Sequence, residues 1–170
     1  MIEECKGYLV QKVKDAGIKS IVHTTMKNLV SSQESHIGAV LFEGDKFERS
    51  GSKTVYRDDL GNKYKRFKKF DRKTSFTIII GEYDQSKCEA IFENFMMSLD
   101  DGIVVNGNFI PIEVEDADWV DKDDSVLKAK VAVQVKVVFD GGIYKDSQYA
   151  KLTKYEIQEI SMSKEEDHGK

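Results

Sequence analysis

The alternation of apolar and polar side chains over residues 126–139 is the feature that most constrains how this chain can fold. The apolar members occupy every odd position: Leu127, Ala129, Val131, Val133, Val135, Val137 and Phe139. The positions between them carry mostly lysine and glutamine, so the pattern predicts a strand with one apolar and one solvated face. Residues 127–139 would span roughly 43 Å at about 3.3 Å each, against about 17–20 Å for an ordinary strand. We expect such a strand either to bend at a bulge or to extend past its own domain and pair with a neighbour.

Two amphipathic helices are predicted. In residues 2–16 apolar side chains recur at steps of three and four, and Gly17 ends the segment. In residues 84–99 Asp84 can cap the free N–H groups of the first turn, and Gly102 closes the segment. The second helix carries a clear apolar stripe: Cys88, Ile91, Phe92, Phe95, Met96 and Leu99.

The remaining strands are predicted at 18–23, 37–43 and 74–80, with a polar loop at 44–53. Two hairpins complete the pattern. One turns at 59–62, where Gly61 and Asn62 tolerate a positive φ, and the other turns at Asn106-Gly107. Pro111 is expected at a sheet edge or a bulge because it has no N–H to donate.

The expected fold is one α+β domain over residues 1–160. It should hold a mostly antiparallel or mixed twisted sheet, two amphipathic helices packed on it, and a long β-hairpin extension. Residues 150–160 are expected to add a last edge strand, and 161–170 to form a disordered tail. A length of 170 residues and a single proline both fit one domain without a linker.

Composition indicates the compartment in which the protein folds and the classes of partner it is expected to lack. Two cysteines are not the pattern of a disulfide scaffold, and the N-terminus lacks a basic stretch followed by an apolar run. No apolar segment approaches the roughly 20 residues that span a bilayer. We therefore expect folding in a reducing cytoplasm and no membrane partner. The net charge of -4 argues against a general nucleic-acid binder, although local patches can override it.

Motifs for catalysis are missing from the sequence. It contains no phosphate-binding glycine loop, no GxSxG and no HExxH spacing. His23 and His36 are interpreted as structural, because a metal pair would lack a third ligand of suitable spacing. Cys5 and Cys88 lie on apolar helix stripes and are expected to be buried hydrophobes. We expect no enzyme activity, no cofactor and no metal; the acidic segment 121–126 lacks the glycine and glutamate of a calcium loop.

Two segments of opposite charge are the clearest surface features. Residues 46–73 carry eleven basic and four acidic side chains, a balance of +7. Residues 113–124 carry seven acids and one lysine, a balance of -6. If they lie apart, copies can join head to tail into a ring; otherwise both are merely solvated or meet within one monomer. The candidate interface residues are Arg57, Lys63, Lys65, Arg66, Lys68, Lys69, Glu113, Glu115, Asp116, Asp118, Trp119, Asp121, Asp123 and Asp124.

Trp119 stands inside the acidic run and is either a core anchor or an interface hot spot. The basic strand 63–73 has a second interpretation, because basic residues interleaved with aromatic ones can hold nucleic acid. Strand alternation would place Tyr64 and Phe70 on one face and Phe67 on the other. The sequence thus predicts no shared stacking platform, and a protein contact is favoured over a nucleic-acid-binding module.

Three segments in order resemble a known family: GEYDQSKCEAIFENFMMSL, GIVVNGNFIPIEVEDADWVDKDDS and KAKVAVQVKVVFDGGIYKD. Their element order, size and texture over residues 1–160 resemble the tail terminator (tail completion) proteins of long-tailed phages and phage-tail-like bacteriocins. The resemblance contains no short diagnostic motif. It implies a non-catalytic α/β subunit of the virion tail, assembled in the bacterial host cytoplasm as a ring, typically a hexamer.

Such a ring would cap the tail tube, stop tube and sheath growth, and offer a surface to head or collar proteins. DNA would be a partner only if it passes through the lumen. The family supplies no invariant residues to carry over, so the interface residues above rest on the charge pattern alone. A neck or head-completion protein, whose ring would face the portal, is the other structural interpretation.

Overall fold

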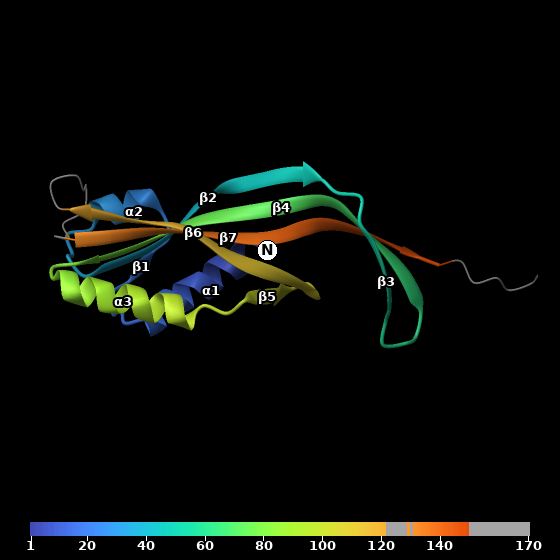
Figure 1. Ribbon diagram of the computed structural model, residues 1–170, viewed down its shortest axis with the longest axis horizontal. Helices are drawn as coiled ribbons and strands as arrows, with labels where there is room; N and C mark the ends of the chain where they lie inside the picture. Colours follow the sequence, from blue (N-terminus) through green and yellow to red (C-terminus); the bar gives the residue numbers. More distant parts are fainter. Residues whose placement is uncertain (122–128, 130, 150–170) are drawn as a thin grey trace, which may run out of the picture.

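The computed structural model describes residues 1–121, 129 and 131–149. In this part of the chain a long twisted sheet of seven strands carries three helices (Figure 1). The elements in chain order are α1 (Ile2–Asp15), β1 (Val22–His23), α2 (Met26–Ser31), β2 (Ile37–Arg49), β3 (Lys53–Arg57), β4 (Lys63–Glu82), α3 (Gln85–Ser98), β5 (Gly102–Val105), β6 (Asn108–Asp121) and β7 (Val131–Gln148).

The strand order in the sheet is β1-β2-β4-β7-β6-β5. β3 pairs with the same side of β4 as β2 does, but nearer to the start of β4. β1 and β2 run parallel, and the other described pairs are antiparallel. The sheet is therefore mixed but mostly antiparallel, which is consistent with the expected α+β class.

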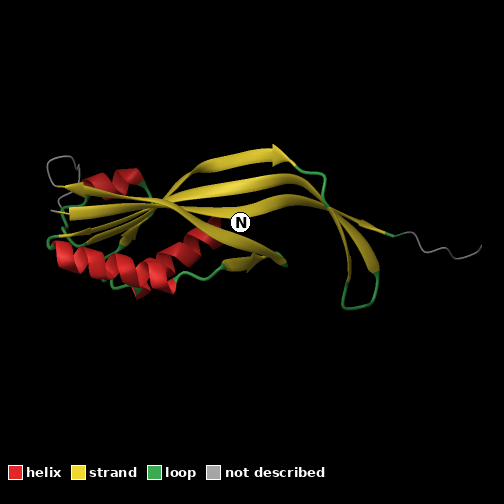
Figure 2. Ribbon diagram, in the orientation of Figure 1, coloured by secondary structure: helices red, strands yellow, loops and turns green. Residues whose placement is uncertain are grey.

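Helices cover both faces of one half of the sheet (Figure 2). α1 and α3 lie on one face, where Leu9 and Phe95 are fully buried against Phe76 and Phe139 of the central strands. The short α2 lies on the other face and buries Leu29 in a second, smaller apolar cluster. Both predicted helices are confirmed within a residue or two, and Asp84 caps α3 by accepting a hydrogen bond from the Lys87 N–H at 3.1 Å.

The predicted loop at 44–53 is wrong for most of its length, because β2 continues to Arg49. A bulge between Phe42 and Gly44 shifts the register, and Gly44 has a φ of 155°. Beyond the bulge the side chains of β2 are largely exposed, which explains why they are polar. The backbone of this stretch is nevertheless paired with β4. The polar composition of residues 44–49 therefore reflects an exposed strand and not a loop.

Two further differences lie near the N-terminus. The strand predicted at 18–23 is reduced to Val22 and His23, although Ile18 is buried. α2 was not predicted; its signal is Thr25, whose hydroxyl accepts a hydrogen bond from the Asn28 N–H at 3.3 Å. A helix of six residues is too short to show a clear apolar period.

Both hairpins are confirmed. Gly61 has a φ of 77° in the first turn, whereas in the second turn Asn106 and Gly107 both have a positive φ, 51° and 73°. Asn62, in contrast to expectation, keeps a negative φ. Pro111 pairs with Gly102 of β5, and the pairing of β6 with β7 starts one residue later at Ile112. The missing N–H of the proline therefore costs the β6–β7 pair no backbone hydrogen bond.

The long strand does extend past the helix-covered body. β7 starts at Val131 and passes Gly141-Gly142 to end at Gln148, while β4 joins the predicted hairpin strand and the strand at 74–80 into twenty residues. Together with β3 they form a three-stranded ribbon, here called the arm, made of residues 53–70 and 143–149, which projects beyond the helices (Figure 1). Residues 126–128 and 130, the strand expected at 150–160 and the tail at 161–170 lie outside the described residues.

Candidate subunit interface

The basic residues of β4 divide between the two faces of the arm. Directly paired residues of antiparallel strands point to the same side, and successive residues point to opposite sides. The register therefore groups Lys53 with Phe67 and Lys145, and Val55 with Lys65 and Ser147. Arg66 falls on the opposite face from both groups.

On one side of the arm, the part formed by 53–57, 63–67 and 145–149 is here called the cationic face and holds nine residues: Lys53, Val55, Arg57, Lys63, Lys65, Phe67, Lys145, Ser147 and Tyr149. None of these positions carries a carboxylate. The lysine ammonium groups of Lys53 and Lys65 lie 5.4 and 5.0 Å from the Phe67 ring centre, and that of Lys63 lies 5.0 Å from the Tyr149 ring. Such contacts order the side chains while leaving their charge uncompensated.

The opposite face is built around Arg66. Its Nε and Nη2 donate to the two carboxylate oxygens of Asp146 at 2.8 and 2.7 Å. Tyr56 donates to the same carboxylate at 3.0 Å and stacks on Tyr64 with ring centres 5.4 Å apart. Arg66 also donates to the side-chain oxygen of Asn108 at 2.9 Å, which ties the arm to the tip of the β5–β6 hairpin. The charge of Arg66 is thus used within the molecule and is not free for a partner.

The bidentate bond from Arg66 lowers the pKa of the Asp146 carboxyl from its usual value, and the Tyr56 hydroxyl adds to this effect. The pair therefore stays charged at neutral pH. Because the two residues are 80 positions apart in the sequence, the pattern of charges around Arg66 could not identify Asp146 as its partner.

A bulge at Lys69 overturns one prediction about the aromatic residues. Lys68 pairs with Tyr144 and Phe70 pairs with Ile143, so β4 contains one extra residue between these pairs. Ile143 and Lys145 share a face of β7, which places Phe70 on the same side as Phe67 and not with Tyr64. Regular alternation along β4 would have placed Phe70 with Tyr64, but the extra residue of the bulge moves Phe70 to the other face.

Other basic residues near the base of the arm are neutralised locally. Lys68 pairs with Asp71 at 2.6 Å, and Arg72 pairs with Asp45 at 2.6 Å. In the described chain no ion pair with a carboxylate occurs for four of the predicted basic interface residues, namely Arg57, Lys63, Lys65 and Lys69. Lys53, Lys145 and Tyr149 lie on the same face but were not among the predicted interface residues. For Lys145 and Tyr149, the alternation of side chains in a strand over residues 143–149 could have indicated this position.

The predicted acidic residues from Glu113 to Asp121 lie along β6, and two of them are paired inside the monomer. Glu113 pairs with Lys73 at 3.2 Å, and Glu115 pairs with Lys136 at 2.7 Å. Asp116 and Asp118 are exposed and have no salt bridge to the residues described. Asp121 is the last residue of β6, whereas Asp123 and Asp124 lie outside the described residues.

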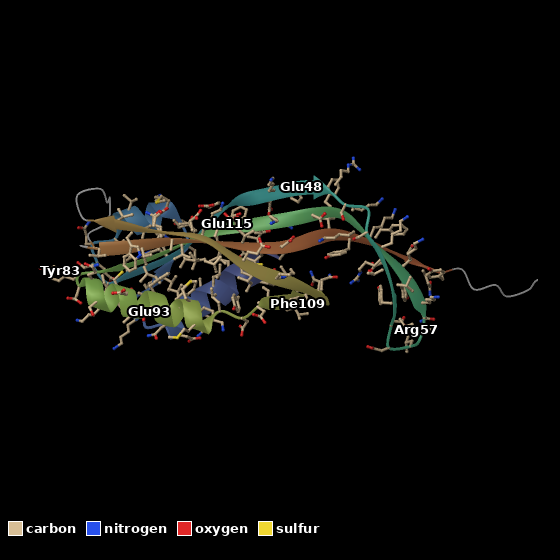
Figure 3. The ribbon with its side chains drawn as sticks, in the orientation of Figure 1. Glu48, Arg57, Tyr83, Glu93, Phe109 and Glu115 are labelled. Atoms are coloured by element: carbon tan, nitrogen blue, oxygen red, sulfur yellow. The ribbon has the colours of Figure 1, made fainter. Side chains whose placement is uncertain are left out.

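Trp119 is packed on one side and exposed on the other, and its role at an interface stays a prediction. Its ring packs edge-on against Phe92 of α3 with centres 5.7 Å apart, yet 45% of the residue remains exposed. The two charged regions touch at the Lys73–Glu113 pair but are otherwise apart. Figure 3 shows Arg57 near the far end of the arm, whereas Glu115 lies over the body of the sheet.

The residues examined for chemistry have structural contacts. His36 accepts a hydrogen bond from the Lys19 N–H at its Nε2, 3.0 Å away, and its Nδ1 contacts the Glu82 carboxylate. Cys5 and Cys88 are fully buried, and burial raises the pKa of each thiol to about 11. Among the described residues no three potential ligands gather into a metal site.

Within the same ranges, no helix has both the length and the apolar character needed to cross a bilayer. No known family model matches the chain, and comparison with curated proteins finds none of similar sequence.

Proposed function

We propose that this protein is a structural subunit that joins copies of itself into a closed ring, and that the ring is a tail terminator. The open outer edge of β3 is the observation that carries the proposal. β3 pairs with β4 on one side, and the described strands offer it no second partner. An unpaired edge of this kind is a template for a strand from another chain unless it is protected.

The hydrogen-bond pattern identifies which groups of β3 are available. The Asp58 N–H donates to the Asn62 carbonyl and the Lys68 N–H donates to the Ser52 carbonyl, so even-numbered residues of β3 bond to β4. The backbone N–H and C=O groups of Lys53, Val55 and Arg57 consequently face away from the arm. Val55 is 50% exposed, which leaves its strand edge open to a partner.

β6 offers a matching edge. β5 pairs with it only over 108–111, so from Glu113 onward its outer side has no partner strand among those described. Asp116 and Asp118 lie on this stretch, and Lys53 and Arg57 flank the edge of β3. Opposite charges that face each other across a strand pair stabilise it and fix its direction.

An arm edge on one subunit and a β6 edge on the next make a head-to-tail contact, because the two surfaces differ. Such contacts generate a ring when the rotation between subunits closes. The arm projects beyond the helix-covered body, which gives it the reach to lie on a neighbour. The resemblance in element order to tail terminators supplies the biological setting: a ring, typically of six copies, that caps the tail tube and meets sheath, head or collar proteins.

The variant Val55→Pro tests the strand-edge contact, since it removes an outward N–H and leaves the β3–β4 bonds intact. Val55→Thr is the matched control because it keeps that N–H. We expect native mass spectrometry and sedimentation velocity to show a ring for the wild type and Val55→Thr, and monomers for Val55→Pro. Negative-stain images of the wild type should show closed rings.

Charge exchange gives an independent test. Asp116→Lys with Asp118→Lys should weaken assembly, as should Lys53→Asp with Arg57→Asp, and combining the four changes should restore it. A wild-type protein that stays monomeric at low salt and high concentration would rule the proposal out. Rings that resist both sets of changes would place the contact elsewhere on the molecule.

A further inference from the structure

The cationic face of the arm extends beyond the β3 edge that strand-edge assembly uses: Lys53 and Arg57 border that edge, whereas Lys63, Lys65 and Lys145 lie on the two inner strands. Its cations are contributed by all three strands: Lys53, Arg57, Lys63, Lys65 and Lys145. Lys65 is half-buried and the other four residues are exposed. Neighbouring strands are about 4.8 Å apart, so these like charges are crowded onto a narrow ribbon. Their mutual repulsion is a cost that a bound polyanion would remove.

The contrast between the two faces of the arm excludes a simple structural explanation. On the opposite face Arg66 is matched by Asp146, and at the base Lys68 is matched by Asp71. On the cationic face Lys53, Lys63 and Lys65 lie over aromatic rings, and no described carboxylate forms an ion pair with them. A ribbon that needed its charges for stability would pair them with carboxylates, as the opposite face does.

We propose that the cationic face of the arm binds nucleic acid through the phosphate backbone, without preference for base sequence. Five cations on one surface, none of them in an ion pair with a described carboxylate, fit the regular negative charge of a phosphate chain. Phe67 and Tyr149 lie among them, and Tyr149 is 42% exposed, so a base of a single strand has a ring on which to stack.

An acidic protein is a weaker fit as the occupant. A carboxylate-bearing protein segment offers no base to stack on the Phe67 and Tyr149 rings that lie among these cations. The nucleic-acid proposal does not rest on ring formation, because Lys63, Lys65 and Lys145 take no part in the strand-edge contact. In a ring whose arms turned inward, the face would line the lumen.

Fluorescence anisotropy with a labelled mixed-sequence DNA duplex, and with one of its strands alone, measures the binding. Each phosphate contact contributes about -0.9 to the slope of log affinity against log salt, so five contacts predict a slope of about -4.5 on a duplex. The variant Lys63→Gln with Lys65→Gln should lower that slope by about 2 and weaken affinity roughly 50-fold near 0.1 M salt.

Lys14→Gln with Lys87→Gln is the matched control, since both lysines are exposed on helices of the body and the change in charge is the same. It should leave affinity and slope unchanged. Lys145→Gln, on a different strand, should lower the slope by about 1. Circular dichroism and oligomeric mass, measured on every variant, separate loss of nucleic-acid binding from loss of fold or of ring.

Tighter binding of the single strand than of the duplex would assign a stacking role to Phe67 and Tyr149 and support the proposal. Absence of saturable binding to both oligonucleotides at low salt would overturn it. Equal weakening by the helix control would overturn it as well. So would competition by polyglutamate as effective, per charge, as competition by unlabelled DNA, because the face would then be a docking surface for acidic protein.

Discussion

Lys73 of β4 and Glu113 of β6 form an ion pair across β7, with Nζ and Oε2 3.2 Å apart. It joins the two charged segments of the sequence, which are 40 residues apart, within one molecule. Glu115 of β6 is used in the same way, by an ion pair with Lys136. The cations of the cationic face have no such carboxylate partner among the described residues, and this asymmetry is the reason for assigning that face a binding role.

Loss of Arg66 should loosen the arm without unfolding the body. In Arg66→Ala the carboxylate of Asp146 and the amide of Asn108 both lose their contact with the guanidinium. We expect faster amide hydrogen exchange in the segment 144–148, measured by mass spectrometry, and unchanged exchange in α1 and α3. Lys69→Ala at the exposed bulge is the control and should leave both regions as in the wild type. Unchanged exchange in Arg66→Ala would show that the arm is held by other means.

Asp45 should make stability depend on pH in the acid range. Burial of this carboxyl favours its neutral form, but hydrogen bonds from Arg72 and Thr74 outweigh burial and lower its pKa below 3.8. A lowered folded-state pKa stabilises the protein above the unfolded value, and that stabilisation is lost as the pH falls below 3.8 towards the folded value.

Urea unfolding across this acid window should therefore show a steeper loss of stability in the wild type than in Asp45→Asn. Asp59→Asn, at the exposed turn of the first hairpin, is the control and should follow the wild type. Parallel curves for wild type and Asp45→Asn would mean that the Arg72–Asp45 pair makes no net contribution to stability.

Adding a methyl group at two glycines should have opposite effects. A Cβ at Gly81 would lie 2.7 Å from Ile37 Cγ2 and 2.9 Å from the Ala129 Cβ, so Gly81→Ala should cost about 1–3 kcal/mol of unfolding free energy. Gly7 lies in the middle of α1 with no atom within 4 Å of such a Cβ, so Gly7→Ala should stabilise by about 0.5–1 kcal/mol. Thermal and urea unfolding measure both. A tolerated alanine at Gly81 would show that Ile37 moves aside.

The two thiols should be unreactive in the folded protein. Burial raises the pKa of Cys5 and Cys88 to about 11, so the thiolate is scarce at neutral pH, and neither sulfur is reached by solvent. A colorimetric thiol reagent should detect almost none in the native state and both after denaturation. Rapid reaction of either cysteine in the native state would indicate local opening of its helix.

Several elements could be predicted because their signals are local. Asp84 marks the start of α3, and the Asn106-Gly107 turn places the second hairpin, since caps and tight turns depend on a few adjacent residues. The end of β2 could not be predicted, because a polar strand and a polar loop have similar composition. Phe70 was assigned to the wrong face because a one-residue bulge at Lys69 leaves no local trace in the sequence.

The sequence by itself determined where the apolar faces lie, which segments turn, and that charge is concentrated at 46–73 and 113–124. Those properties follow from side-chain chemistry and the periods of helix and strand. Only the tertiary structure decided which charges are free. An ion pair such as Arg66–Asp146 forms between residues distant in the chain, and strand register and bulges set which side chains share a face. For that reason basic residues that are neighbours in the sequence lie on two different faces. Arg66 is tied to the body through Asn108, whereas Lys63 and Lys65 lie on the cationic face.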